Sequence, residues 1–133
     1  MASHVAAVIN LILDQFYPST VKGVSPPPLP SKASYPYVTV HEVSGIELEN
    51  IVGPSGLVKS VVQVNCWDVD YERGWQARKS IQDYLSTFSG DVIISSAVEA
   101  VIHSVNHVGT SHLYDGDREV HQLITRLSIW LDS

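Results

Sequence analysis

Histidines are the first residues in this 133-residue chain that could do chemistry. Four of the six, His103, His107, His112 and His121, fall within nineteen positions. If the first two lie on one strand, they are about 13 Å apart and cannot share a metal ion; only a helix would bring them onto one face. No HExxH pattern and no carboxylate partner pattern accompanies them. We therefore expect no metal site, and we interpret the histidines as surface or interface residues.

Two acidic clusters are the next candidates for chemistry. They are Asp68-Val-Asp70-Tyr-Glu72 and Asp115-Gly-Asp117-Arg-Glu119. We interpret the first as the cap of a helix and the second as the tip of a hairpin. Neither has the ligand spacing of a calcium loop. A small hydrolase that uses the acidic or histidine clusters remains an alternative.

The single cysteine, Cys66, excludes an internal disulfide. It stands among valines, so we interpret it as a small buried residue and not as a nucleophile. The sequence has no GxSxG, no Walker loop and no GxGxxG. The sequence therefore contains none of these catalytic or cofactor-binding motifs, and we expect no cofactor.

The charge balance argues against a protein that grips nucleic acid. The formal net charge is −6, from 14 acidic and 8 basic side chains, and the basic residues are scattered. The apolar patch Val5–Leu13 lacks the basic flank and cleavage site of a signal peptide. No apolar run approaches the roughly 20 residues that a membrane span needs. We expect a soluble protein, made inside the cell, with no membrane partner.

The stretch Val61–Leu85 organises the rest of the chain. Its first half alternates with a period of two, which predicts a strand, and after Asp68 apolar residues recur at threes and fours, which predicts a helix. Trp67, Tyr71 and Trp75 lie at this junction. Because aromatic residues concentrate in interface cores, we expect these three to anchor packing, including packing across subunits.

The remaining elements follow from the same patterns. We expect a helix over residues 4–16, on which Val8 and Ile12 form part of a wide apolar stripe that serves as core or as a subunit contact. A proline-rich arm over 17–34, containing a PxxP match, leads to strands at 35–44 and 57–67, joined by the connection 45–56. Residues 97–107 favour a strand, although a helix from Asp91 is an alternative; residues 109–116 favour a loop, and a last strand runs to 131.

This order, α-β-β-α-β-β, predicts a single α+β domain over residues 1–133, with the core at 35–131. We expect a mainly antiparallel sheet of about four strands with helices on one face. The other face carries Val61, Trp67, Val120, Ile124 and Trp130. A second apolar face needs a cover, and we expect another subunit to provide it.

The chain resembles the tail-completion proteins of long-tailed bacteriophages, also called tail terminators or head-to-tail joining proteins. The resemblance rests on the order and spacing of several short motifs, and it covers roughly residues 5–16 and 35–131. The motifs are Pro36-Tyr-Val38, Gly53-Pro-Ser-Gly56-Leu57, Val62-Gln-Val64-Asn-Cys66-Trp67, Tyr71 before a helix, Leu113-Tyr114-Asp115 and Ser128-Ile-Trp130. The proline cluster departs from the family pattern, and so does Asn65, where an acidic residue is expected.

The resemblance implies a structural virion protein that is not an enzyme. It is assembled in the host cytoplasm and forms a homo-oligomeric ring, typically a hexamer. Such a ring ends growth of the tail tube at its head-proximal end and binds the tube protein and the head connector. DNA passes through the lumen without specific binding. Candidate lumen or docking residues are Glu47, Glu49, Pro54, Asp115 and Asp117, and candidate interface residues are Trp67, Tyr71, Trp75, Trp130, Val8 and Ile12. The main alternative is a small ligand-binding or regulatory α+β module.

Overall fold

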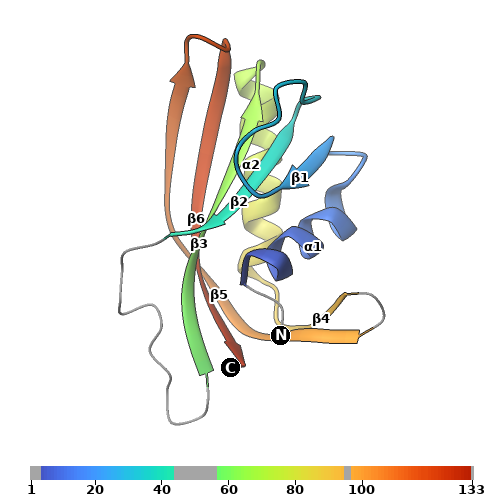
Figure 1. Ribbon diagram of the computed structural model, residues 1–133. Helices are drawn as coiled ribbons and strands as arrows, with labels where there is room; N and C mark the ends of the chain where they lie inside the picture. Colours follow the sequence, from blue (N-terminus) through green and yellow to red (C-terminus); the bar gives the residue numbers. More distant parts are fainter. Residues whose placement is uncertain (1–3, 44–56, 95–96, 133) are drawn as a thin grey trace.

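Two helices lie on the same side of a twisted, mostly antiparallel six-stranded sheet (Figure 1). The computed structural model describes residues 4–43, 57–94 and 97–132. In chain order the elements are α1 (His4–Phe16), β1 (Gly23–Ser25), β2 (Tyr37–Glu42), β3 (Leu57–Asp68), α2 (Tyr71–Ser86), β4 (Gly90–Ile94), β5 (Ala97–Asp115) and β6 (Val120–Asp132). The predicted α+β class is confirmed, and so is the helix over residues 4–16.

The strands lie in the order β1-β2-β3-β6-β5-β4. The expected antiparallel pair of β2 and β3 is confirmed, and β6 pairs with both β3 and β5. The expected number of strands, about four, was wrong because two short strands were missed. Strand β1 lies inside the predicted arm and pairs parallel with β2, at the edge of the sheet and just before the prolines. Strand β4 pairs with the start of β5, in the segment that the sequence left open between helix and strand.

The second half of β5 corrects another expectation. Residues 109–115 were expected to form a loop, but they continue the strand and pair with β6, so the turn lies at residues 116–119. Register shifts at 102/104 and 107/109 interrupt the pairing of β5 with β6 without ending it. Such bulges bend a strand and increase its twist. The two strands form the long β5–β6 hairpin, and β6 also pairs with β3 over residues 121–132 (Figure 1).

The core fills the space between the helices and one face of the sheet. Val62, Val64 and Cys66 of β3 are fully buried there, as the alternation predicted. Helix α1 supplies Ala7, Val8, Leu11, Ile12 and Phe16, and α2 supplies Ala77, Ile81 and Leu85. Each large apolar side chain buried in this way contributes roughly 1.5–3 kcal/mol. Helix α1 contacts β1 and β2 at one sheet edge and β4 at the other, so the sheet curls around it.

The other face of the sheet is not the apolar surface that was expected. Cross-strand register places polar side chains there on three adjacent strands, including Thr39 of β2, Asn65 of β3 and Gln122 of β6. Of the expected apolar residues, Val120 and Ile124 are buried, whereas Val61, Trp67 and Trp130 are half-buried. The alternation of inward and outward residues along β3 and β6 was predicted correctly. The prediction of an apolar second face was wrong because polar residues lie between the apolar ones on that face.

The proline-rich segment is hydrogen-bonded to the turn that precedes β6. The Arg118 guanidinium donates hydrogen bonds to the carbonyl oxygens of Leu29 (3.3 Å) and Pro30 (2.9 Å). Leu29 and Val120 are both buried, and both lie outside the main core cluster. These two hydrogen bonds dock the segment against the turn between β5 and β6. In the part of the chain that the structure describes, no helix has the length and apolar character to span a bilayer.

Candidate interaction surfaces

The junction of β3 and α2 is held by an ion pair of which one partner, Asp68, is buried. Asp68 ends β3 with a fully buried side chain, and its carboxylate accepts hydrogen bonds from Nε and Nη2 of Arg73, both at 2.7 Å. The Asp70 side chain caps α2 by accepting from the Arg73 backbone N–H, which confirms the predicted helix cap in the first acidic cluster. The hydrogen bonds from Arg73 to the Asp68 carboxylate, with its charge, raise the pKa of the guanidinium, so Arg73 stays charged.

Gly74 lets α2 begin close to the sheet. A Cβ at this position would lie 2.6 Å from Cδ1 of Leu123 and 3.0 Å from Cβ of Asp68. Both distances are shorter than ordinary van der Waals contact, so a side chain here would push the helix away from β3 and β6. The missing side chain at Gly74 thus allows the close approach of α2 to Asp68 of β3 and Leu123 of β6.

An exposed aromatic surface covers the start of α2 and the adjoining half of β5. It consists of Tyr71, Trp75, His112 and Tyr114. Tyr71, Trp75 and Tyr114 keep 41%, 39% and 55% of their surface exposed. The Tyr71 ring meets His112 edge-on at 4.9 Å between ring centres. Tyr71, Trp75 and His112 also line a groove of about 180 Å³.

His121 joins this surface from β6. His112 Nε2 lies 2.9 Å from His121 Nδ1, so one imidazole donates a hydrogen bond to the other. The Tyr114 ring packs on His121 at 4.8 Å between ring centres. Large exposed aromatic side chains held in fixed geometry are typical of protein interfaces, because they bury much apolar area at little entropic cost.

A polar network covers the middle of the open sheet face. Its centre is Asn65, which is 2% exposed; its Oδ1 accepts from Nε2 of Gln63 (2.7 Å) and from Nε2 of Gln122 (2.9 Å). Its Nδ2 donates to Oγ1 of Thr39 at 3.2 Å. The Trp67 indole N–H donates to the same threonine oxygen at 2.9 Å. Trp67 therefore belongs to a satisfied polar network and not to an open apolar patch.

His41 and Arg126 extend the network. Arg126 Nε donates to Oε1 of Gln63 at 3.1 Å, and Asn65 Nδ2 lies 3.4 Å from Nδ1 of His41. Partial burial, and to a lesser extent the charge of Arg126, lower the pKa of His41. The neutral imidazole is thus the form that fits this face, with Nδ1 as the acceptor.

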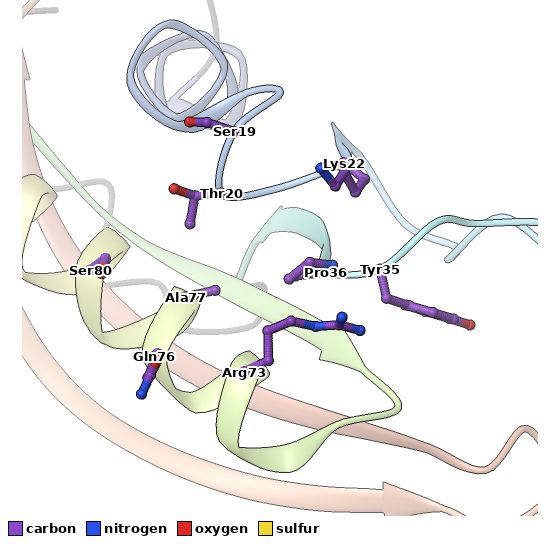
Figure 2. Close-up of a pocket in the computed structure, with 9 residues that line it drawn as sticks. All are labelled: Ser19, Thr20, Lys22, Tyr35, Pro36, Arg73, Gln76, Ala77 and Ser80. Atoms are coloured by element: carbon purple, nitrogen blue, oxygen red, sulfur yellow. The ribbon is translucent and has the colours of Figure 1, made fainter.

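A cavity of about 410 Å³ opens on the helix side of the sheet (Figure 2). Its walls come from the connection after α1, from Tyr35-Pro36 before β2 and from the first three turns of α2. Figure 2 shows Arg73 reaching from α2 toward Tyr35 and Pro36, with Lys22 on the opposite wall. Among the described residues that line it, none is acidic.

The other predicted site residues lie in several places. Glu47, Glu49 and Pro54 fall outside the described residues. Asp115 is engaged in the hairpin turn, where its Oδ1 accepts from the backbone N–H groups of Asp117 and Arg118, and Asp117 itself is exposed. Val8 and Ile12 lie in the core. Trp130 lies on the open face with Lys59 Nζ 5.9 Å from its ring centre.

Two further findings concern the chemistry considered first. In the described ranges, no three residues of the types His, Cys, Asp or Glu gather closely enough to hold a metal ion. Burial raises the pKa of the Cys66 thiol to about 12.

Sequence patterns missed the Asn65 network and the Lys22–Arg73 cavity, because each depends on which strands and helices become neighbours.

Comparison with known proteins gives a likeness of fold. No protein-family model and no curated protein sequence matches the chain. Among solved structures, the fold is similar to that of a chain described as "Virion of native gene transfer agent (GTA) particle". The TM-score is 0.63 at 14% identity, and the match covers 99% of this chain and 100% of the other. The chain therefore shares its fold from end to end with a protein of a gene transfer agent virion.

Proposed function

We propose that this chain is a structural virion protein that forms a ring at the head-proximal end of a phage-like tail. The ring, a hexamer by resemblance to tail terminators, ends growth of the tail tube and joins the tail to the head connector. The observation that carries the proposal is the fold likeness to a gene transfer agent virion chain, which spans both chains almost completely. The motif resemblance in the sequence points in the same direction.

The exposed aromatic surface is the best candidate for the contact between subunits. Tyr71, Trp75 and Tyr114 are held in place by α2 and by the β5–β6 hairpin, yet they remain about 40–55% exposed. A fixed arrangement of this kind loses little side-chain entropy when a partner covers it. Subunit packing on this surface replaces the earlier expectation of packing on the open sheet face, which is largely polar.

The charge of the chain suits a channel for DNA. Six subunits would carry 6 × (−6) = −36 formal charges. Because DNA phosphates are not neutralised by such a wall, DNA can pass without being held. Asp117, exposed on the hairpin tip, is one of the lumen candidates.

Purified tail tubes test this proposal. Electron microscopy of tubes mixed with the chain should show one ring at a single end of each tube, and capped tubes should not elongate when free tube protein is added. A chain that leaves tube ends bare and elongation unchanged would contradict the proposal. Heat-denatured chain at the same concentration is the control.

A ligand-binding module is the second candidate, and the 410 Å³ cavity is the observation that favours it. Cavities of about 300–1,000 Å³ are the usual size for small-molecule sites. This alternative predicts a monomer or dimer whose mass does not depend on concentration. Size-exclusion chromatography with light scattering distinguishes it from a chain that assembles into a six-subunit ring.

A further inference from the structure

The cavity between the connection after α1 and helix α2 is lined by basic side chains, although the whole chain is acidic. Only 8 of the 133 residues are basic, yet Lys22 and Arg73 both line this one cavity. They come from elements about fifty positions apart in sequence, so the fold brings them together, and the lining residues in the described ranges include no carboxylate. Two basic side chains on the walls of one cavity in an acidic protein point to an anionic ligand.

Asp68 fixes the guanidinium of Arg73 without using all its donors. A guanidinium has five N–H groups in a planar fork, and Asp68 accepts from Nε and from Nη2. Asp68 is fully buried, whereas 52% of the Arg73 side chain is exposed. The remaining N–H groups can therefore bind a ligand, and the buried carboxylate holds them in one orientation.

Lys22 is positioned in a similar way on the opposite wall. Its ammonium group donates one hydrogen bond to the carbonyl oxygen of Pro18 at 3.1 Å, which restrains the side chain. An ammonium group has two further N–H donors. Tyr35 and Ser80 line the same cavity, while Pro36 and Ala77, both buried, provide apolar wall.

We propose that this cavity binds an oxyanion, a carboxylate or a phosphate group, through Arg73 and Lys22. Oxyanions accept charge-assisted hydrogen bonds from both cation types, and arginine suits them best because its fork matches two oxygens. The volume of about 410 Å³ leaves room for the small organic or peptide part that carries the anion. This proposal does not depend on the ring.

Titration by nuclear magnetic resonance at constant ionic strength tests the proposal. The probes are inorganic phosphate and the capped dipeptide acetyl-Glu-Glu-amide, with acetyl-Gln-Gln-amide as the uncharged control. We expect saturable shifts of the Arg73 Nε–H and of the Lys22 amide with at least one anionic probe. Saturation by the peptide alone would assign the site to carboxylates, and saturation by phosphate alone would assign it to phosphates.

A matched pair of variants separates the site from diffuse surface charge. Lys22→Gln should weaken binding about tenfold, the effect of one lost charge-assisted hydrogen bond. Lys79→Gln removes the same charge from the exposed face of α2, where Lys79 pairs with Asp83, and should leave binding unchanged. Both positions are exposed, so both variants should fold. The proposal fails if neither probe saturates, if the uncharged peptide binds equally well, or if the two variants have equal effects.

Discussion

Two ion pairs made by basic residues of helix α2 have the same length but should differ greatly in their contribution to stability. Arg73–Asp68 and Lys79–Asp83 both have N–O distances of 2.7 Å. The Asp68 side chain is 0% exposed, whereas that of Asp83 is 60% exposed. We predict that Arg73→Met destabilises the chain strongly and that Lys79→Met does so only slightly.

The magnitude follows from what each variant leaves behind. Removing one partner of a buried pair costs about 3–5 kcal/mol, because the other charge stays buried. Water can reach the space left by the half-exposed Arg73, so we expect a value at or below the lower end, about 2–3 kcal/mol. An exposed i,i+4 pair contributes about 0.3–0.5 kcal/mol, which sets the expected cost of Lys79→Met.

Urea unfolding at pH 7 and 25 °C, followed by circular dichroism, measures both variants. The Arg73→Met midpoint should fall by about 1 M urea or more, with the Lys79→Met midpoint close to that of the unchanged protein. The double variant Asp68→Asn/Arg73→Met should be more stable than Arg73→Met, because the buried charge is gone. Equal midpoints for the two single variants, or a double variant no more stable than Arg73→Met, would refute the reasoning.

Three further predictions follow from the surfaces and the pKa shifts. Trp75→Glu should weaken self-association about 30-fold, as expected for loss of an interface hot spot. The control Gln15→Glu, on the exposed side of α1, should leave self-association unchanged. Analytical ultracentrifugation compares the two variants, and equal effects would disprove the assigned surface. His41 has a lowered pKa in the folded chain, so the unfolded chain binds more protons as the pH falls below the ordinary value of 6.5, and the free energy of unfolding should fall with the pH. His41→Gln should reduce this loss of stability between pH 7.5 and 5.5. An equal reduction by His107→Gln, which changes an exposed side chain, would contradict the assignment to His41. Because the Cys66 thiol has a pKa raised to about 12, it should resist iodoacetamide at pH 8 in the folded chain and react in 8 M urea, as measured by mass spectrometry; rapid labelling of the folded chain would contradict its burial.

Local sequence patterns predicted those helices and strands whose structure depends mainly on their own residues. The alternation of Val62, Val64 and Cys66 located β3 and its buried face, and the change of period after Asp68 located α2. Asp70 could be named as a cap because capping involves only the neighbouring backbone. Helix α1 was equally clear, although its pattern could not decide whether Val8 faces the core or a partner.

Features that depend on pairing between distant segments could not be predicted. Asn65 takes partners from β2 and β6, so its burial is understandable only once the register of three strands is known. The contact of His112 with His121 likewise needs the diagonal neighbours of a hairpin whose length was underestimated. Strand β1 was missed because a three-residue parallel pair leaves almost no pattern in the sequence.

The most direct test of the ring proposal is the tail length in particles made without this protein. In the genome that encodes the chain, its gene is deleted, and the particles are imaged by electron microscopy. The proposal predicts tail tubes that are overlong, variable in length and not joined to heads, with normal tails restored when the chain is supplied from a plasmid. Tails of normal length attached to heads in the deletion strain would contradict it.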